Sequence, residues 1–151
     1  MFIDSAAVLH GAESPVERQV AEAVKSERVT VVHFWAPWCS NCKSELNEHG
    51  WKAFINANPN VQVFFVTIWS DKDGRSILRQ AGVGGQPNFT LLTHLNPPGA
   101  SGRLSEFLGE RIGWLPTTWV FREGQLRYAL NYGEVRFPML QQMVDDSLGK
   151  W

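Results

Sequence analysis

Cys39 and Cys42 are the only two cysteines in the chain, and they form a C-x-x-C pair. Two thiols at this spacing either exchange with a disulfide or supply half of a metal site. A purely structural disulfide is disfavoured, because it would close a loop too small to restrain the unfolded chain. None of the four histidines stands at a ligand-like spacing from the cysteines, so a metal centre, bridged between two copies, is a minor alternative. The pair predicts redox chemistry.

The residues around the pair predict different roles for its two thiols. Ser40 to about Asn56 carries apolar residues at helical spacing, so a helix should begin directly after Cys39. Free backbone N–H groups at a helix N-terminus favour a thiolate at that cysteine. Cys42 lies one turn into the helix and faces inward. We therefore expect Cys39 to be the exposed nucleophile and the shielded Cys42 to resolve the mixed disulfide.

Two apolar runs, Val29–Trp35 and Val61–Trp69, flank this helix and are rich in β-branched and aromatic residues. Such runs are typical of strands buried on both faces of a parallel sheet, joined here by a right-handed crossover. Trp35, Trp69 and Trp119 fall in predicted strands and are expected in the core.

The remaining elements follow from local signals. Ser14 should cap a helix, with Glu17 completing a capping box. The pattern further predicts a short helix over Arg75–Ala81, a strand over Phe89–Thr93, a loop over 96–102, about one helical turn over Leu104–Leu108, a hairpin formed by Thr117–Arg122 and Gln125–Leu130, and a terminal helix over Phe137–Leu148.

Composition restricts the class of protein. The 151 residues, 44% hydrophobic and 19% charged, predict a single globular domain over residues 1–151. A net charge of −1 gives no excess of basic residues that would indicate binding to nucleic acid. No run approaches the about 18–20 apolar residues of a membrane helix. The N-terminus lacks a basic signal region, which predicts a cytoplasmic protein, although a periplasmic chain whose signal or anchor has been removed would look the same.

Two motifs resemble the thioredoxin superfamily. The segment from Val32 to Lys43 reads VHFWAPWCSNCK and is similar to the V-x-F-W-A-x-W-C-x-x-C-K active-site segment of that family. Leu115-Pro116-Thr117-Thr118, just before a strand, resembles its cis-proline signature. Glu45, three residues after the second cysteine, and the long segment after Trp69 resemble the TlpA/ResA-like thiol-disulfide oxidoreductases.

The resemblance implies a fold, an activity and partners. The fold would be α/β and thioredoxin-like: a central mixed sheet flanked by helices, with an insertion, roughly residues 70–114, between the second strand and the cis-proline. The activity would be thiol–disulfide exchange with protein or peptide substrates, and an upstream redox donor would be a second partner. No organic cofactor would be needed. We expect a monomer. The alternative is a non-catalytic binding module or redox sensor that uses the cis-proline groove.

The resemblance also implies further site residues. Trp38 would face the substrate, and Leu115, Pro116 and Thr117 would form the loop that binds it. A cis Pro116 would leave the backbone of Leu115 free to pair with an extended peptide. Glu45 would transfer protons or tune the thiol pKa values.

Three departures from the family pattern bear on these expectations. Asn47 replaces a proline that kinks the active-site helix, which predicts a straighter helix. His33 stands where classical thioredoxins bury an aspartate; it is either a core histidine with a satisfied hydrogen bond or a proton acceptor for Cys42. Ser40-Asn41 replaces the usual Gly-Pro dipeptide, so the redox potential and the direction of electron flow stay open.

Overall fold

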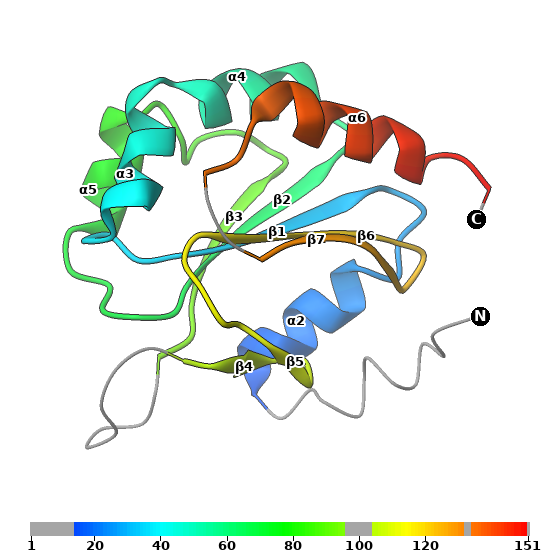
Figure 1. The fold of residues 1–151 in the computed structure, drawn as a ribbon, viewed down its shortest axis with the longest axis horizontal. Coiled ribbons are helices and arrows are strands. Elements are labelled where there is room, and N and C mark those ends of the chain that lie inside the picture. Colours follow the sequence, from blue (N-terminus) through cyan, green and yellow to red (C-terminus); the bar gives the residue numbers. More distant parts are fainter. Residues whose placement is uncertain (1–13, 96–103, 132–133, 151) are drawn as a thin grey trace.

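A mixed five-stranded sheet in the order β3-β2-β1-β6-β7 forms the centre of the molecule (Figure 1). The computed structural model describes residues 14–95, 104–131 and 134–150, so the predictions for the first ten residues and for the loop 96–102 lie outside the described residues. β1, β2 and β3 are parallel, whereas β6 is antiparallel to β1 and β7 to β6. The strands are β1 (Thr30–Trp35), β2 (Gln62–Thr67), β3 (Phe89–Thr93), β6 (Thr117–Arg122) and β7 (Gln125–Leu130).

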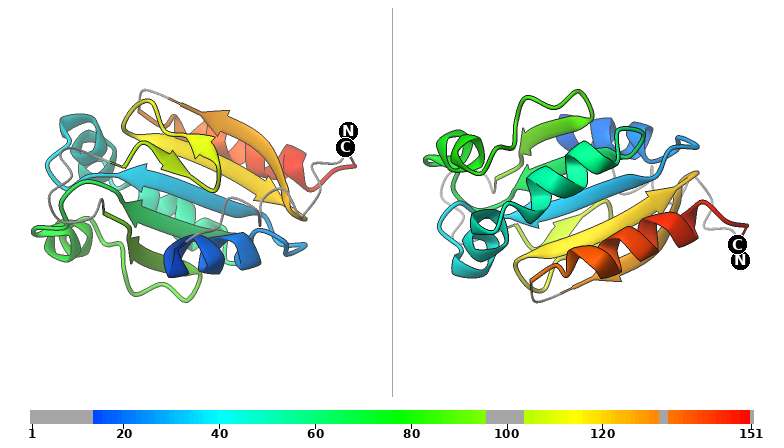
Figure 2. Two further views of the ribbon diagram at one scale, coloured as in Figure 1. Left: turned by 90° about the horizontal axis from the view of Figure 1, so that it is seen from below. Right: turned by 90° about the horizontal axis from the view of Figure 1, so that it is seen from above.

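Helices cover both faces of this sheet. In Figure 1, α3, α4 and α6 lie above it, and α2 lies below it with a small hairpin, β4–β5; Figure 2 shows the same two layers from below and from above. The helices are α2 (Pro15–Ala23), α3 (Ser40–Asn47), α4 (Gly50–Ala57), α5 (Gly74–Gln80) and α6 (Phe137–Ser147), and the hairpin strands are β4 (Glu106–Phe107) and β5 (Glu110–Arg111). None of the helices described is long and apolar enough to cross a membrane.

β1 is buried along its whole length, as its unbroken apolar run predicts. Its side chains alternate between two cores, with Val31 and Trp35 in the upper core and Val32 and Phe34 in the lower one. The upper core is shared with α3, α4 and α6, and the lower core with α2 and the β4–β5 hairpin. The strand that leads to the cysteines is therefore held from both sides.

The start of α2 confirms half of the predicted capping box. The Ser14 hydroxyl accepts a hydrogen bond from the backbone N–H of Glu17 at 3.0 Å, as an N-cap should. The Glu17 carboxylate does not complete a box with Ser14 and instead accepts the backbone N–H of Leu108 at 2.8 Å. It ties α2 to the hairpin, a long-range contact that local pattern could not reveal.

The helix predicted from Ser40 to about Asn56 is broken into α3 and α4, so the expectation of a straighter helix is wrong. His49 adopts a left-handed backbone with φ of 57° between the two helices. Gly50 then begins α4 with the Phe137 ring of α6 packed so closely against it that a Cβ would not fit. The break requires no proline, because a single left-handed residue redirects the chain and a glycine admits the neighbouring helix.

The helical turn predicted at Leu104–Leu108 is also wrong, since this segment forms the β4–β5 hairpin. Leu108 and Gly109 have φ of 52° and 78°, the left-handed pair of a two-residue type I′ turn. Phe107 is fully buried edge-on against Phe34, with ring centroids 5.1 Å apart. Tertiary burial of Phe107 overrides the weak local signal. The other predicted hairpin is confirmed, with Glu123 and Gly124 both at positive φ in its turn.

Candidate functional site

The two thiols lie at the end of β1, where the chain turns into α3. Cys39 is the N-cap residue of α3, and its Sγ accepts the backbone N–H of Cys42 at 3.4 Å. Cys39 retains 8% exposure and Cys42 only 1%. Burial raises the pKa of the Cys42 thiol, and the adjacent Cys39 adds to the shift. Both thiols are therefore buried, with Cys39 at the helix N-terminus slightly less so than Cys42, and the expected exposure of Cys39 is not present in this structure.

The predicted cis peptide is present between Leu115 and Pro116. Phe34 pairs with Thr117 across the β1–β6 ladder, so the residues before β6 lie beside the segment that carries the chain from β1 to Cys39. Leu115 is half-buried and Pro116 is buried. The Thr117 side chain is also buried, and its hydroxyl donates to the Trp114 carbonyl at 2.7 Å. Any contact of Thr117 with a substrate must therefore use its backbone.

Exposed aromatic side chains lie at this end of the sheet. Trp38 is 50% exposed and meets Trp69 edge-on, with ring centroids 4.4 Å apart. Trp69 lies beyond the end of β2 and is only half-buried, so its predicted place in the core is wrong, whereas Trp35 and Trp119 are buried as expected. Trp114, directly before Leu115, is 56% exposed. Trp114 was not predicted as a site residue, although its position beside the cis-proline motif was a usable signal.

Glu45 lies beneath the thiols, one helical turn after Cys42 on the buried side of α3. Among the described residues, neither of its carboxylate oxygens has a hydrogen-bond partner. Burial raises the pKa of Glu45 to about 8; the Trp51 indole and the Val135 backbone oppose this shift without reaching hydrogen-bond geometry, and Glu134 adds to it. This carboxyl group is therefore largely protonated at neutral pH.

His33 projects from β1 onto the same side of the sheet as Glu45. Its Nδ1 lies 2.8 Å from Thr118 Oγ1, and its Nε2 lies 3.7 Å from Glu45 Oε1. The rings of Trp51 and Phe65 pack against the imidazole, with centroids 4.6 and 4.7 Å from it. Burial lowers the pKa of His33 to about 3, so the ring is neutral.

The structure thus brings His33 to Glu45 and not directly to Cys42, because Thr118 and Glu45 are its polar partners among the described residues. The sequence analysis did not single out Thr118. The register supplies the reason for its contact, since His33 and Thr118 are opposite each other in the β1–β6 ladder.

Comparisons with known proteins agree with this architecture. The family model of the thioredoxin-like domain matches residues 16–148. No protein of curated function is similar to the chain in sequence.

Several solved structures share the fold. A secreted disulfide oxidoreductase of Mycobacterium tuberculosis, homologous to E. coli DsbE, is 20% identical over 82% of this chain and 84% of its own, with a TM-score of 0.61. A thiol-disulfide isomerase from Corynebacterium glutamicum is 14% identical over 86% of each chain, with a TM-score of 0.63. A putative thioredoxin from Neisseria meningitidis is 25% identical over 83% of this chain and 77% of its own, with a TM-score of 0.56. With its family match covering most of its length, the chain belongs to the thioredoxin-like domain family.

Proposed function

We propose that this chain is a thiol–disulfide oxidoreductase that acts on protein or peptide thiols. The observation that carries the proposal is the arrangement of the pair: Cys39 caps α3 and keeps a little more exposure than Cys42, which is buried one turn behind it. A thiolate at a helix N-terminus is an effective nucleophile, whereas a shielded second thiol attacks only the sulfur bonded to its neighbour. The similar solved structures include a disulfide oxidoreductase and a thiol-disulfide isomerase, which agrees with this chemistry.

The exchange proceeds in two steps when the reduced protein meets a substrate disulfide. The Cys39 thiolate attacks one substrate sulfur, which forms a mixed disulfide and releases the other substrate sulfur as a thiolate. The Cys42 thiolate then attacks Cys39 Sγ, which releases the second substrate thiolate and leaves a Cys39–Cys42 disulfide. Two electrons pass to the substrate, and an upstream redox donor restores the dithiol. The same steps in reverse oxidise a substrate dithiol.

Glu45 is proposed to accept the proton that the Cys42 thiol must lose before it attacks. Burial raises the pKa of Glu45 to about 8, which makes its carboxylate a stronger base than an ordinary glutamate and better able to take a proton from Cys42, whose own pKa burial also raises. The neutral His33 supplies no charge to favour a thiolate. Since its ring lies between Thr118 and Glu45, we assign it as a positioning residue for the Glu45 carboxyl group.

The loop at Leu115–Pro116 is proposed to bind the substrate chain. An extended peptide beside this loop can pair with the Leu115 backbone by β-augmentation. Trp38 offers an exposed aromatic surface next to Cys39 for the flanking substrate side chains. Thr117 positions the loop through its hydroxyl bond to the Trp114 carbonyl.

The compartment is part of the proposal. One similar structure is of a secreted protein, and none of the similar structures named above supports a cytoplasmic location. We therefore favour the periplasmic or otherwise extracytoplasmic alternative, and we expect the chain to act as a monomer.

Trapping tests the proposal directly. Cys42→Ser should accumulate substrate proteins on Cys39 as mixed disulfides that a reductant releases, because the resolving thiol is gone. Cys39→Ser is the matched control and should trap none. The wild-type protein should reduce insulin in the presence of a thiol donor. Failure of both trapping and insulin reduction would contradict the proposal and favour a non-catalytic binding module.

A further inference from the structure

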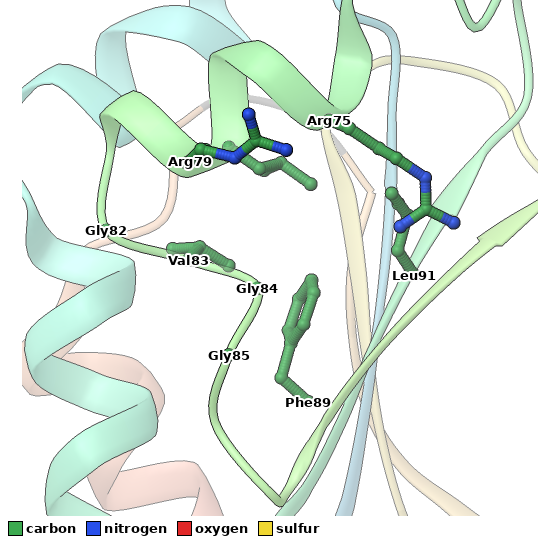
Figure 3. Close-up of a pocket in the computed structure, with 9 residues that line it drawn as sticks. Arg75, Arg79, Gly82, Val83, Gly84, Gly85, Phe89 and Leu91 are labelled. Atoms are coloured by element: carbon green, nitrogen blue, oxygen red, sulfur yellow. The ribbon is translucent and has the colours of Figure 1, made fainter.

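A hollow opens between α5 and β3 at the edge of the sheet (Figure 3). It encloses about 440 Å³, with Arg75 and Arg79 on one side, Phe89 and Leu91 from β3 on the other, and the glycine-containing segment from Gly82 to Gly85 between them. A second hollow of about 410 Å³ shares the two arginines and Leu91 and extends to Thr93. Together they form a groove along β3.

The first hollow carries unneutralised positive charge. Arg75 and Arg79 are exposed and lie one turn apart on α5, and their guanidinium groups have no hydrogen bond or ion pair within the described part of the chain. The aliphatic part of the Lys52 side chain lies over Gly82, next to this hollow. Among the described residues, no acidic side chain lines this hollow; Asp71 and Asp73 line the second hollow, which the two arginines also line. In a chain of net charge −1, this is a local site for anionic groups.

The edge of β3 offers backbone groups along the same groove. β3 pairs only with β2 in the described sheet. The Asn88 carbonyl accepts from Val63 N–H at 2.9 Å, and His94 N–H donates to the Thr67 carbonyl at 2.8 Å. Because alternate residues of a parallel strand bond to the same neighbour, Leu91 and Thr93 direct their N–H and C=O groups away from β2. Such an edge is a template for another strand.

We propose that this groove binds an extended acidic segment of a partner protein as an added strand on β3. The partner's backbone would pair with Leu91 and Thr93. Its alternate side chains would point to the α5 side, where carboxylates meet Arg75 and Arg79. The apolar floor of Phe89 and Leu91 accommodates the aliphatic parts of the same side chains.

The groove extends toward the dithiol end of the sheet. β1, β2 and β3 are parallel, so their carboxyl ends lie at the same end of the sheet. Thr93, at the end of β3, is therefore at the end of the sheet where β1 leads to Cys39. Gly74, at the start of α5, lies against Pro37, where a Cβ would be 3.3 Å from the proline Cγ. A partner bound in the groove is therefore held beside the dithiol, although the binding itself does not depend on the proposed exchange.

Binding of a synthetic peptide tests the proposal. A short labelled peptide that alternates glutamate and valine should bind the full chain in fluorescence anisotropy, and the same peptide with glutamine for glutamate should bind roughly tenfold more weakly or not at all. Added salt should weaken binding of the first peptide. The double variant Arg75→Gln/Arg79→Gln should lose about the same factor, while Arg111→Gln, an exposed arginine on β5, should bind as the wild type does.

A second pair of variants tests strand pairing separately from charge. Thr93→Pro removes an outward N–H and costs no bond to β2, so it should weaken peptide binding several-fold. Thr93→Ala, which removes only the side chain, should not. Thermal unfolding and insulin reduction by these variants should match the wild type, which shows that the fold and the dithiol are intact.

Three results would overturn the proposal: equal binding of the glutamate and glutamine peptides, unchanged binding by the double arginine variant, or unchanged binding by Thr93→Pro. Full displacement of the peptide by free glutamate would also overturn it, since the hollow would then be a site for small anions. Absence of insulin reduction by the wild type, with peptide binding retained, would count against the proposed function and leave the groove proposal standing.

Discussion

Two buried glutamates, one on each side of the sheet, differ in whether their carboxyl oxygens are hydrogen-bonded. On the lower side, Glu17 accepts the backbone N–H of Leu108 at 2.8 Å and has His94 Nε2 at 3.7 Å from its other oxygen. On the upper side, Glu45 is more deeply buried, and among the described residues neither of its oxygens is hydrogen-bonded. The first carboxylate connects two elements. The second is held in a state that costs free energy.

The surroundings of the two glutamates extend this contrast. The lower core is built from aromatic and aliphatic groups, with Phe34 edge-on to both Phe107 and Trp119. The upper side of the sheet also holds a polar pair, His33 and Glu45, whose Nε2 and Oε1 lie 3.7 Å apart, and Glu45 is one turn after Cys42 on the buried side of α3. Unsatisfied buried polar groups such as the Glu45 oxygens are rare in native proteins, which agrees with the proton-transfer role proposed for Glu45. We therefore expect substitutions on the lower side of β1 to change stability, and substitutions of the polar pair on the upper side to change the proposed thiol chemistry as well.

The largest expected effect lies on the lower side. Phe34→Ala should reduce the free energy of unfolding by about 3–5 kcal/mol, because it opens a cavity between two aromatic rings. Denaturant unfolding followed by tryptophan fluorescence would measure the loss. A loss below about 1 kcal/mol would contradict the tight packing of Phe34 against these two rings.

On the upper side, stability should depend on pH through Glu45. Its folded pKa of about 8 lies above the ordinary value of 4.5, so the folded state holds a proton that the unfolded state has released between these pH values. The contribution of Glu45 to the free energy of unfolding is therefore fully present below pH 4.5 and is lost as pH rises through about 8.

His33 has the opposite sign, since its pKa falls from 6.5 to about 3 and its contribution is lost as pH falls through that range. Between pH 6.5 and 8 only the Glu45 effect remains of the two, and it should lower the free energy of unfolding by about 2 kcal/mol. Glu45→Gln should abolish this loss in urea titrations at a series of pH values. A wild-type slope that survives in the variant would assign the effect to another group.

Thr118→Val should cost between about 1 and 2 kcal/mol, although it preserves shape. The variant removes the hydroxyl at 2.8 Å from His33 Nδ1 and leaves a buried ring nitrogen without its partner. Thr118→Ser keeps the hydroxyl and is the matched control. If the valine and serine variants unfold at the same denaturant concentration, the contact does not hold His33 in place.

The smallest effects are expected from the matched substitutions Glu17→Gln and Glu45→Gln, one on each side of the sheet. Glu17→Gln keeps an acceptor for Leu108 N–H but removes its charge, so it should cost about 1 kcal/mol at pH 7. Glu45→Gln at the same pH should cost less than this or stabilise the protein, because no hydrogen bond is lost. Equal effects of the two variants in parallel unfolding curves would remove the contrast between the two sides.

Much of the thiol end was predictable because its signals are local or carried by short motifs. The apolar run of β1, the C-x-x-C pair after it and the Leu115–Pro116 motif predicted a buried strand, a thiol at a helix N-terminus and a cis peptide, and the structure has all three. Strand burial and the start of a helix depend on neighbouring residues in the chain, so the sequence pattern can predict them.

Long-range packing decided the rest. Sequence pattern could not show that Phe137 of α6 packs on Gly50, that Phe107 is buried against Phe34, or that Glu17 reaches Leu108 and not its own helix start. The His33 environment likewise depends on the β1–β6 register and on the placement of α3, which together bring Thr118 and Glu45 to one ring. The sequence determined which groups could react, because reactivity begins with residue type and local backbone. The tertiary structure decided their burial, partners and charge states, because these depend on residues far away in the chain.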